Sequence, residues 1–195
     1  CPAHVDIPKF VGEIASGRFR DAYETLRAAN VLAAVCGYVC PSETLCESGC
    51  INEHYSEPVP IRHLQRWVSR KAVDEGWVRE PRVPLRKDGK LVAVIGAGPA
   101  GVAGAVTLAS LGHKVTLFER GEAGGVAKAT IPADRLPDPI VKREIEDALV
   151  SAGAIERRSG VELGSGTGLD EIVNEGFEAV LVAPGLSASV ELGGQ

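Results

Sequence analysis

The amino-acid sequence predicts a chain in two parts, an α-helical region followed by an α/β domain. Residues 1–80 are rich in Cys, His and Arg and place apolar side chains at helical spacing. From residue 91 onward, short apolar runs typical of buried parallel strands alternate with helical segments. The segment 81–90 between them is charged, carries two prolines and lacks apolar periodicity. We therefore expect two domains, 1–80 and 91–195, joined by a linker at 81–90.

Two segments of the first part are expected to be helical. Residues 7–30 predict two short amphipathic helices, with Pro8 in the first turn of the first helix. Gly17 should separate the two, and Asp21 is expected to cap the second. Residues 60–76 predict a third helix that ends at Gly76. Its apolar face consists of Ile61, Leu64, Val68 and Ala72.

The second part predicts four strands and two helices. Apolar runs bounded by glycine or charged residues indicate the strands, and longer amphipathic or apolar segments indicate the helices. The strands are expected within residues 91–96, 114–119, 154–164 and 177–185, and the helices within 99–112 and 138–154.

Composition and charge restrict the classes of function that the chain is expected to have. The chain has 195 residues, 45% of them hydrophobic and 24% charged, as in soluble globular proteins. A net charge of -5 argues against a nucleic-acid partner. No apolar run approaches the about 20 residues that span a membrane, and no signal peptide opens the chain, so we expect a cytoplasmic location. The chain starts with Cys1 and contains no Met, so we expect it to be a piece of a longer protein.

A glycine fingerprint follows the first predicted strand. In the sequence VIGAGPAG, Gly96, Gly98 and Gly101 have the G-x-G-x-x-G spacing, with Pro99 and Ala100 between the last two. Gly96 suits a tight strand-to-helix turn, Gly98 a close approach of a pyrophosphate, and Gly101 close packing of helix on sheet. The N–H groups of the following helix would face the phosphate charge. This pattern predicts a Rossmann-like dinucleotide-binding domain.

The residues after the fingerprint favour FAD as the dinucleotide. Glu119 ends the second strand 23 residues after Gly96, near the separation of about 20 expected for an acid that binds ribose hydroxyls. An acid there disfavours the 2′-phosphate of NADP, and FAD and NAD remain. Gly124 and Gly125 follow the acid, and Gly185 ends the last strand, where ligands of α/β domains bind. Together these glycines favour FAD.

Four of the five cysteines crowd into fifteen residues, with the spacing Cys36-x3-Cys40-x5-Cys46-x3-Cys50. Nothing marks the chain for export, so a disulfide framework is disfavoured. The spacing fits a zinc site only in part. Iron–sulfur clusters use thiolates at short spacings and often a distant Cys-Pro, which Cys1 and Pro2 supply. A one-electron carrier beside a flavin also makes chemical sense.

These motifs resemble one flavoprotein family along nearly the whole chain. The family includes the glutamate synthase small subunit and the N-terminal part of dihydropyrimidine dehydrogenase, with its bacterial NAD-dependent subunit. The resemblance is carried, in order, by CPAHVDIPKF, CGYVCPSETLCESGC, HLQRW, VAVIGAGPAG, LFER (with Arg120) and its following Gly-Gly, IPADRLP and VLVAPG. It implies FAD, two [4Fe-4S] clusters in the helical domain, and NAD(P)H bound by a domain outside this chain, since no second glycine fingerprint is present. The segment GGVAKATIP departs from the family pattern near the flavin ring.

The resemblance also implies a division of the ligands. Residues matching Cys1, Cys40, Cys46 and Gln65 hold one cluster. The residue matching Cys50 joins a second cluster whose other ligands precede Cys1 in the family and are absent here. Cys36 matches no ligand and is expected to be a buried thiol. His4, His54 and His63 are alternatives to Gln65 as ligands, although each is more typical of a surface or hydrogen-bonded histidine.

The spacing of the cysteines by itself leaves two arrangements of the cluster ligands open. If the sequence ETLCESGC is helical as far as Gly49, Cys46 and Cys50 share a face but lie about 6 Å apart along the axis, which suits two neighbouring clusters as well as one. The competing arrangement places Cys1, Cys40, Cys46 and Cys50 around one cluster and leaves Gln65 free.

The sequence as a whole predicts an electron-transfer oxidoreductase subunit or fragment that serves a catalytic partner. The partner would hold the substrate site, whether for a pyrimidine, for glutamate synthesis or for a 2-oxoacid. No residue stands out as a general acid, a general base or a nucleophile. One rival is a zinc-stabilised interaction module fused to a nucleotide-binding domain without a redox role. Another is a flavoenzyme with a redox disulfide, which would need a cysteine pair beside the flavin, and no Cys follows residue 50.

Overall fold

The computed structural model describes residues 1–77, 88–153, 155–164 and 167–186. The chain divides into two compact units, one made of Cys1–Glu80 and Ile131–Ala148, the other of Pro81–Thr130 and Leu149–Gln195. In this division residues 131–148 group with the helical unit, although they lie within the range expected for the second domain. Most of the expected linker, residues 81–87, lies outside the described residues.

The first unit is helical, as predicted. Its α-helices are α1 (Ile7–Ala15), α2 (Phe19–Ala29), α3 (Ala33–Val39), α4 (Ile61–Asp74) and α7 (Asp138–Ser151) as far as Ala148, and its short 3-10 helices are η1 (Ser42–Thr44) and η2 (Ile51–His54). Pro8 lies in the first turn of α1, and Asp6 caps that helix by accepting a hydrogen bond from the N–H of Lys9. Gly17, with a φ of 73°, lies in the short connection between α1 and α2.

One local prediction in this unit is wrong, and one condition considered for the cysteines does not hold. Helix α2 starts after Arg18, so Asp21 lies inside its first turn and does not cap it. There the carboxylate pairs with Arg18 at 3.5 Å and faces the positive end of the helix dipole. The sequence ETLCESGC is not a continuous helix either. The 3-10 helix η1 ends at Thr44, and turns follow it, so Cys46 and Cys50 do not share a helix face.

The core of the helical unit forms along the predicted apolar face of α4. Val68 and Ala72 are fully buried there against Phe10 of α1 and Leu26 of α2. Helix α3 packs closely against the same helix. A Cβ atom on Gly37 would lie 2.9 Å from the Cα of Arg66, so this crossing requires a glycine.

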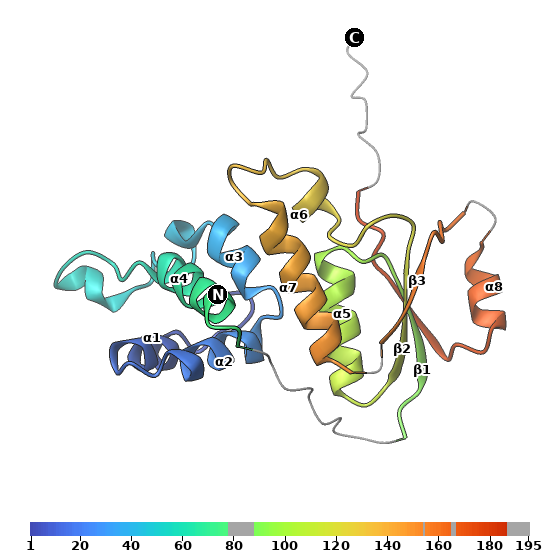
Figure 1. Ribbon diagram of the computed structural model, residues 1–195, viewed down its shortest axis with the longest axis horizontal. Coiled ribbons are helices and arrows are strands. Elements are labelled where there is room, and N and C mark those ends of the chain that lie inside the picture. The colour runs from blue at the N-terminus through green and yellow to red at the C-terminus, as the bar shows by residue number, and fades with distance from the viewer. Residues whose placement is uncertain (78–87, 154, 165–166, 187–195) are drawn as a thin grey trace, which may run out of the picture. The chain divides into compact units, whose positions relative to one another are not determined.

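The second unit is an α/β domain with a parallel sheet. Its elements are β1 (Leu91–Ile95), α5 (Pro99–Ser110), β2 (Lys114–Glu119), α6 (Val126–Ala129), β3 (Ile155–Ser159), α8 (Leu169–Asn174) and β4 (Ala179–Val182). The strands lie in the order β3-β2-β1-β4 and every pairing is parallel (Figure 1). The four predicted strands and the helices at 99–112 and 138–154 are confirmed, whereas α3, α6 and α8 were not predicted.

The order of the strands indicates where along the sheet a ligand is expected to bind. The chain runs outward from β1 through β2 to β3, then returns to place β4 on the other side of β1. Helix α5 covers one face of the sheet, and Ile172 of α8 packs on the other face against Ala93 and Ile95 (Figure 1). Ligands of such sheets bind beyond the carboxyl ends where the direction of winding changes, which here is the end of β1 and β4.

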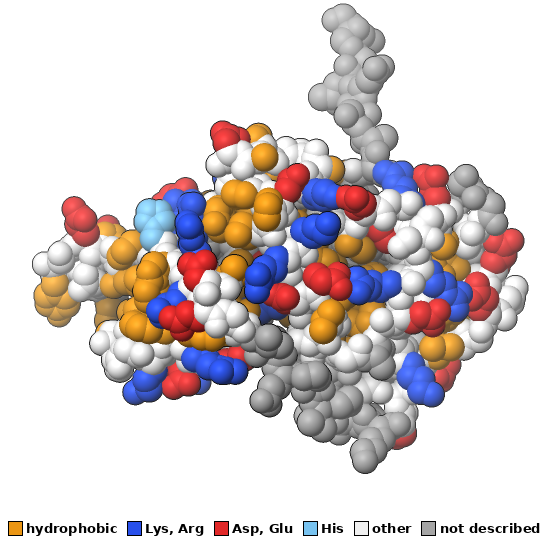
Figure 2. Space-filling view, viewed as in Figure 1, with side chains coloured by type: hydrophobic (Ala, Val, Ile, Leu, Met, Phe, Trp, Pro, Cys, Tyr) orange, Lys and Arg blue, Asp and Glu red, His pale blue; other side chains and the backbone are white. Residues whose placement is uncertain are grey.

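None of the helices in the described ranges is both long and apolar enough to cross a bilayer. On the face shown in Figure 2, acidic and basic side chains are interspersed.

Candidate functional site

The turn after β1 requires glycine at two of the three fingerprint positions. Gly96 has a φ of 98°, and a Cβ there would lie 2.3 Å from the carbonyl oxygen of Ala183. A Cβ on Gly101 would lie 1.7 Å from the carbonyl oxygen of Gly96. These two glycines therefore let the turn, the start of α5 and the end of β4 come together.

The backbone conformation and packing do not require glycine at position 98. Its φ of -75° and ψ of -178° suit any residue, and an added Cβ would meet only the Cα of Gly125, at 3.7 Å. The protein fold itself would accept a side chain here. The residue also forms the N-terminal cap of α5, where no side chain bonds the first N–H groups. A small open space beside an uncapped helix start fits a phosphate group.

Glu119 lies beside this turn, at the end of β2. Its Oε2 accepts a hydrogen bond from the N–H of Ala97 at 2.7 Å, and its Oε1 accepts one from the N–H of Gly121 at 2.9 Å. The carboxylate is thus held at the mouth of a cavity of about 110 Å³ at the carboxyl ends of the strands. The cavity is lined by Ile95, Gly96, Phe118, Glu119, Arg120, Val161, Glu162, Leu163 and Pro184.

The other predicted dinucleotide residues surround the same turn to different degrees. Gly125, with a φ of 49°, approaches so closely that a Cβ on it would lie 2.8 Å from the Cα of Gly98. The N–H of Gly124 donates to the carbonyl of Ala97 at 2.9 Å. Arg120 lines the cavity and pairs with Glu162 at 3.0 Å. Gly185 follows β4 with a φ of 69° but does not line the cavity.

In the helical unit, all five cysteines are free thiols. Burial is the main factor that raises the pKa of the Cys46 thiol, and the nearby Glu47 and Cys40 add to the rise. A backbone hydrogen bond and the N-terminal amine of Cys1 act in the opposite direction. Cys40 and the start of the chain therefore lie near enough to Cys46 to influence its pKa.

Helix α4 anchors the segments that carry Cys40 and Cys46. The N–H of Arg62 donates to Oε1 of Glu47 at 3.0 Å, which ties the residue after Cys46 to the first turn of the helix. The Arg62 guanidinium donates to the carbonyl of Cys40 at 3.3 Å. Both cysteines are thereby held near the start of α4, less than one turn before Gln65.

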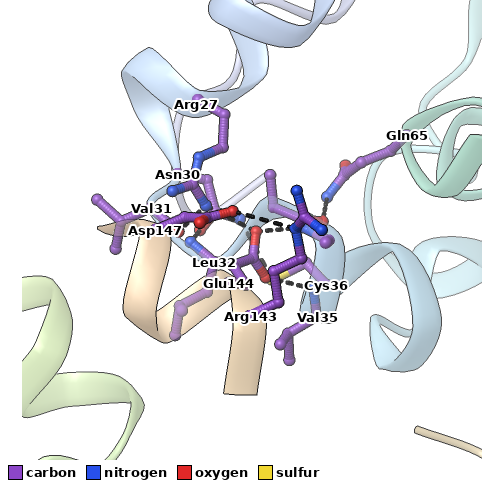
Figure 3. Close-up of polar contacts among 12 residues, drawn as sticks. Arg27, Asn30, Val31, Leu32, Val35, Cys36, Gln65, Arg143, Glu144 and Asp147 are labelled. Atoms are coloured by element: carbon purple, nitrogen blue, oxygen red, sulfur yellow. Dashed lines mark hydrogen bonds and ion pairs between the residues drawn. The ribbon is translucent and has the colours of Figure 1, made fainter. Parts of the chain in front are cut away.

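Gln65 itself is held by its amide nitrogen. Nε2 donates a hydrogen bond of 2.6 Å to the carbonyl oxygen of Ala33 at the start of α3 (Figure 3). A carbonyl oxygen only accepts hydrogen bonds, so this contact requires the NH₂ end of the amide. The side-chain oxygen Oε1 is left as the atom that an iron could bind.

The cysteine predicted not to be a ligand has a local partner instead. Nδ2 of Asn30 donates to Sγ of Cys36 at 3.2 Å. Burial raises the pKa of the Cys36 thiol, and this hydrogen bond opposes the rise. Of the alternative histidine ligands, His4 has a φ of 53° and closes a turn by donating its N–H to the carbonyl of Cys1, while His54 and His63 are exposed.

The geometry is unlike that of a single-ion site. Within the described ranges, no three His, Cys, Asp or Glu side chains converge closely enough to hold one metal ion. A structural zinc ion needs four ligands at about 2.0–2.3 Å from one point. Thiolates on a four-iron cluster bind at separate corners and need not meet at one ion. A larger cavity of about 220 Å³ in this unit contains none of the predicted ligands.

Several contributing residues were not predicted from the sequence. Gly37, Glu47 and Arg62 position the cysteine segments, and Glu144 with Arg27 holds the start of α3. Glu47 lies within CGYVCPSETLCESGC next to Cys46, and Arg62 immediately precedes HLQRW, three residues before Gln65, so both positions were a usable signal. Glu144 lies more than 100 residues from its partners and gave no signal.

Comparison with known proteins gives a match for each part of the chain. Residues 1–77 match the family described as dihydropyrimidine dehydrogenase domain II, 4Fe-4S cluster. Residues 90–188 match the family described as pyridine nucleotide-disulphide oxidoreductase. These matches confirm the predicted resemblance, the oxidoreductase class and the two kinds of cofactor, iron–sulfur cluster and redox dinucleotide.

Individual relatives extend along nearly the whole chain. The NAD-dependent dihydropyrimidine dehydrogenase subunit PreT of Escherichia coli strain K12 is 39% identical over 189 residues, which are 96% of this chain and 45% of the relative. The same subunit of Salmonella typhimurium is 37% identical over 188 residues, 96% of this chain and 44% of the relative. The NADPH glutamate synthase small chain of Azospirillum brasilense is 36% identical over 188 residues, 95% of this chain and 38% of the relative.

The chain thus spans less than half the length of these relatives. Among solved structures, histamine dehydrogenase from Rhizobium sp. 4-9 matches at 26% identity over 56% of this chain and 16% of its own, with a TM-score of 0.43, too low to define a shared fold. The second match alone covers half of the sequence. The chain belongs to the pyridine nucleotide-disulphide oxidoreductase family, with a domain that matches the 4Fe-4S domain II of dihydropyrimidine dehydrogenase ahead of it.

Proposed function

We propose that this chain is the electron-transfer part of an NAD(P)H-dependent oxidoreductase that delivers electrons to a catalytic partner subunit or domain. A bound FAD would supply two-electron hydride chemistry, and a [4Fe-4S] cluster would supply one-electron transfer. The protein's own share is to hold both groups and to set their surroundings. The substrate of the partner is expected among pyrimidines, the reactants of glutamate synthesis and 2-oxoacids.

The observation that carries this proposal is the arrangement around the first turn of α4. Arg62 ties down both the carbonyl of Cys40 and the side chain of Glu47 beside Cys46. Gln65, on the next turn, has its amide nitrogen bound and its oxygen available. We assign Cys1, Cys40, Cys46 and Gln65 as the ligands of one cluster. Cys50 is assigned to a second cluster completed by residues outside this chain.

The dinucleotide site is assigned to the Rossmann-like second unit. The open space at Gly98 and the uncapped start of α5 support a pyrophosphate position over Gly96, Pro99, Ala100 and Gly101. The carboxylate of Glu119 is placed to accept hydrogen bonds from ribose hydroxyls at the neighbouring cavity, which Arg120 also lines. Gly124 and Gly125 would let the cofactor pass over the turn, and Gly185 would approach it from the end of β4.

The remaining assignments concern the whole protein. We propose functional domains at 1–80 and 91–195 with a linker at 81–90, NAD(P)H binding by a domain outside this chain, and action in the cytoplasm. A net charge of -5 and the interspersed charges in Figure 2 support a partner other than nucleic acid.

Anaerobic purification of the full-length protein tests this function. We expect a brown protein with broad visible absorption, flavin that is released on denaturation, and about four iron and four sulfide per cluster. NADH or NADPH should reduce the flavin and the clusters in sequence. A colourless protein that contains zinc and no flavin would overturn the proposal and support a zinc-stabilised interaction module. Identification of the subunit that co-purifies would name the partner.

A further inference from the structure

A buried carboxylate is linked to the proposed glutamine ligand through one peptide group. Glu144 of α7 and Arg27 of α2 form an ion pair of 2.7 Å, with side chains that are 5% and 1% exposed. Oε1 of Glu144 also accepts from the N–H of Ala34, and Oε2 accepts from the N–H of Val35, both at 2.6 Å. The carboxylate therefore holds the first N–H groups of α3 (Figure 3).

The same peptide group bonds Gln65 on its other side. The N–H of Ala34 and the C=O of Ala33 belong to one planar peptide unit. Its N–H donates to Glu144, and its C=O accepts from Nε2 of Gln65. The contacts form an unbroken series from the carboxylate, through the peptide, to the glutamine amide.

We infer that Glu144 positions and polarises the Gln65 amide as a ligand through this peptide, an inference that rests on the proposed assignment of Gln65 to a cluster. A neutral amide is a weak ligand for iron. Negative charge on the N–H side of a peptide strengthens its carbonyl as an acceptor, and hydrogen bonds in series reinforce one another where water is excluded. A stronger bond at Nε2 shifts electron density in the amide toward Oε1, and it also fixes the orientation of the side chain.

The cost of burying an ion pair supports a role beyond packing. Buried salt bridges often contribute less to stability than apolar residues of the same size, because both charges lose hydration. Outer partners that orient a metal ligand are by contrast a common device, and their loss typically weakens metal binding about 10–100-fold. Glu144 would be such a positioning residue, since it touches no proposed ligand directly.

Two substitutions break the series at different points in the full-length protein. Glu144→Gln removes the negative charge. Ala34→Pro removes the N–H that meets Oε1 but keeps the charge and the bond from Val35. Proline is tolerated at the second position of a helix, as Pro8 is in α1 of this chain. Asp147→Asn, which removes a half-exposed charge paired with Arg143 on the same helix, is the control for a through-space effect. Val68→Ala, a buried change on the helix that carries Gln65, is the control for lost stability.

The readouts are the reduction potential of the cluster, followed by electron paramagnetic resonance, and the rate of iron release to a chelator under anaerobic conditions. Glu144→Gln and Ala34→Pro should each raise the potential, since less electron density reaches Oε1, and should release iron about tenfold faster. Both effects should vanish in a Gln65→Glu background, which lacks the Nε2–H donor. The two controls should keep the unsubstituted potential.

The outcomes separate this inference from the proposed function. The inference is overturned if Ala34→Pro keeps the unsubstituted potential and release rate, or if Asp147→Asn shifts the potential as much as Glu144→Gln does. Ala34→Pro decides the matter alone if Glu144→Gln does not fold. A normal cluster whose spectrum is unchanged by Gln65→Ala would refute the ligand assignment and this inference with it, while leaving the electron-transfer function standing. Absence of any cluster in the unsubstituted protein would refute both.

Discussion

The carboxylate of Glu119 accepts a hydrogen bond of 2.7 Å from the main-chain N–H of Ala97, in the middle of the glycine turn. This bond fixes the acid at the end of β2 next to the path assigned to the pyrophosphate. The carboxylate belongs to a cavity wall and not to an ion pair with the adjacent Arg120, which pairs with Glu162. Its remaining acceptor capacity is available for ribose hydroxyls.

Replacement of this acid should weaken FAD binding without affecting iron. Hydrogen bonds to a charged group contribute about 1.5–3 kcal/mol each, so Glu119→Ala should raise the Kd for FAD by about tenfold or more. Flavin and iron per chain in the purified protein measure the effect. Glu156→Ala, which removes a largely exposed carboxylate from β3, is the matched control and should keep full flavin. Equal flavin occupancy in the Glu119 variant would count against the assignment.

An added methyl group should impair flavin binding at Gly98 but folding at Gly101. Gly98→Ala places its Cβ in open space, so the protein should fold and keep its iron but lose flavin, and Gly98→Val should lose more. Gly101→Ala drives its Cβ into the carbonyl of Gly96, so it should lower the yield of folded protein. Flavin content and thermal unfolding of both variants separate the two roles. Normal flavin binding by Gly98→Val would show that no cofactor passes over this residue.

The strands and the glycine turn were predictable because their signals are local. Leu91–Ile95 and Lys114–Glu119 are apolar runs bounded by turn residues, and a buried parallel strand needs little else. The turn after β1 is marked in the sequence by three glycines within six residues, two of which the turn itself requires. The position of Glu119 beside the turn follows from parallel pairing, which sets Ile95 opposite Phe118.

Helix α3 was missed because its start is stabilised by distant residues. Leu32 precedes it and offers no side-chain cap, so the sequence around residue 33 lacks a start signal. The first N–H groups are satisfied instead by Glu144, 110 residues further along the chain. Residues 131–148 are likewise far along the chain from the rest of the helical unit, so the sequence did not indicate that they belong to it. The ligand pattern proposed for the clusters comes from resemblance, since spacing alone left one-site and two-site arrangements open.

Replacement of only one partner of the Arg27–Glu144 pair should lower the free energy of unfolding strongly. Arg27→Leu leaves a buried carboxylate without its cation, and the expected loss is about 3–5 kcal/mol in the free energy of unfolding. Glu144→Leu in the same chain removes the unpaired charge but leaves the N–H groups of Ala34 and Val35 without their acceptor, so it should restore only part of that loss. Arg70→Leu, which breaks an exposed pair with Asp74, should cost less than about 1 kcal/mol.

Urea unfolding followed by tryptophan fluorescence measures these differences in the helical unit alone. The chain has two tryptophans, Trp67 and Trp77, and both belong to that unit. If Arg27→Leu unfolds at the same urea concentration as the unsubstituted protein, the pair does not support the start of α3 as described.

The two-site assignment of the cysteines makes the last prediction. The segments of Cys40 and Cys46 are both anchored to the start of α4 through Arg62, whereas Cys50 is the N-terminal cap of the separate 3-10 helix η2. In the full-length protein, Cys40→Ser and Cys50→Ser should therefore disturb different signals in electron paramagnetic resonance, each with a partial loss of iron. Cys36→Ser should leave both signals in place, because Cys36 is assigned to neither cluster and its Sγ accepts a hydrogen bond from Asn30. If Cys40→Ser and Cys50→Ser instead abolish one and the same signal, a single cluster held by Cys1, Cys40, Cys46 and Cys50 replaces the arrangement with Gln65.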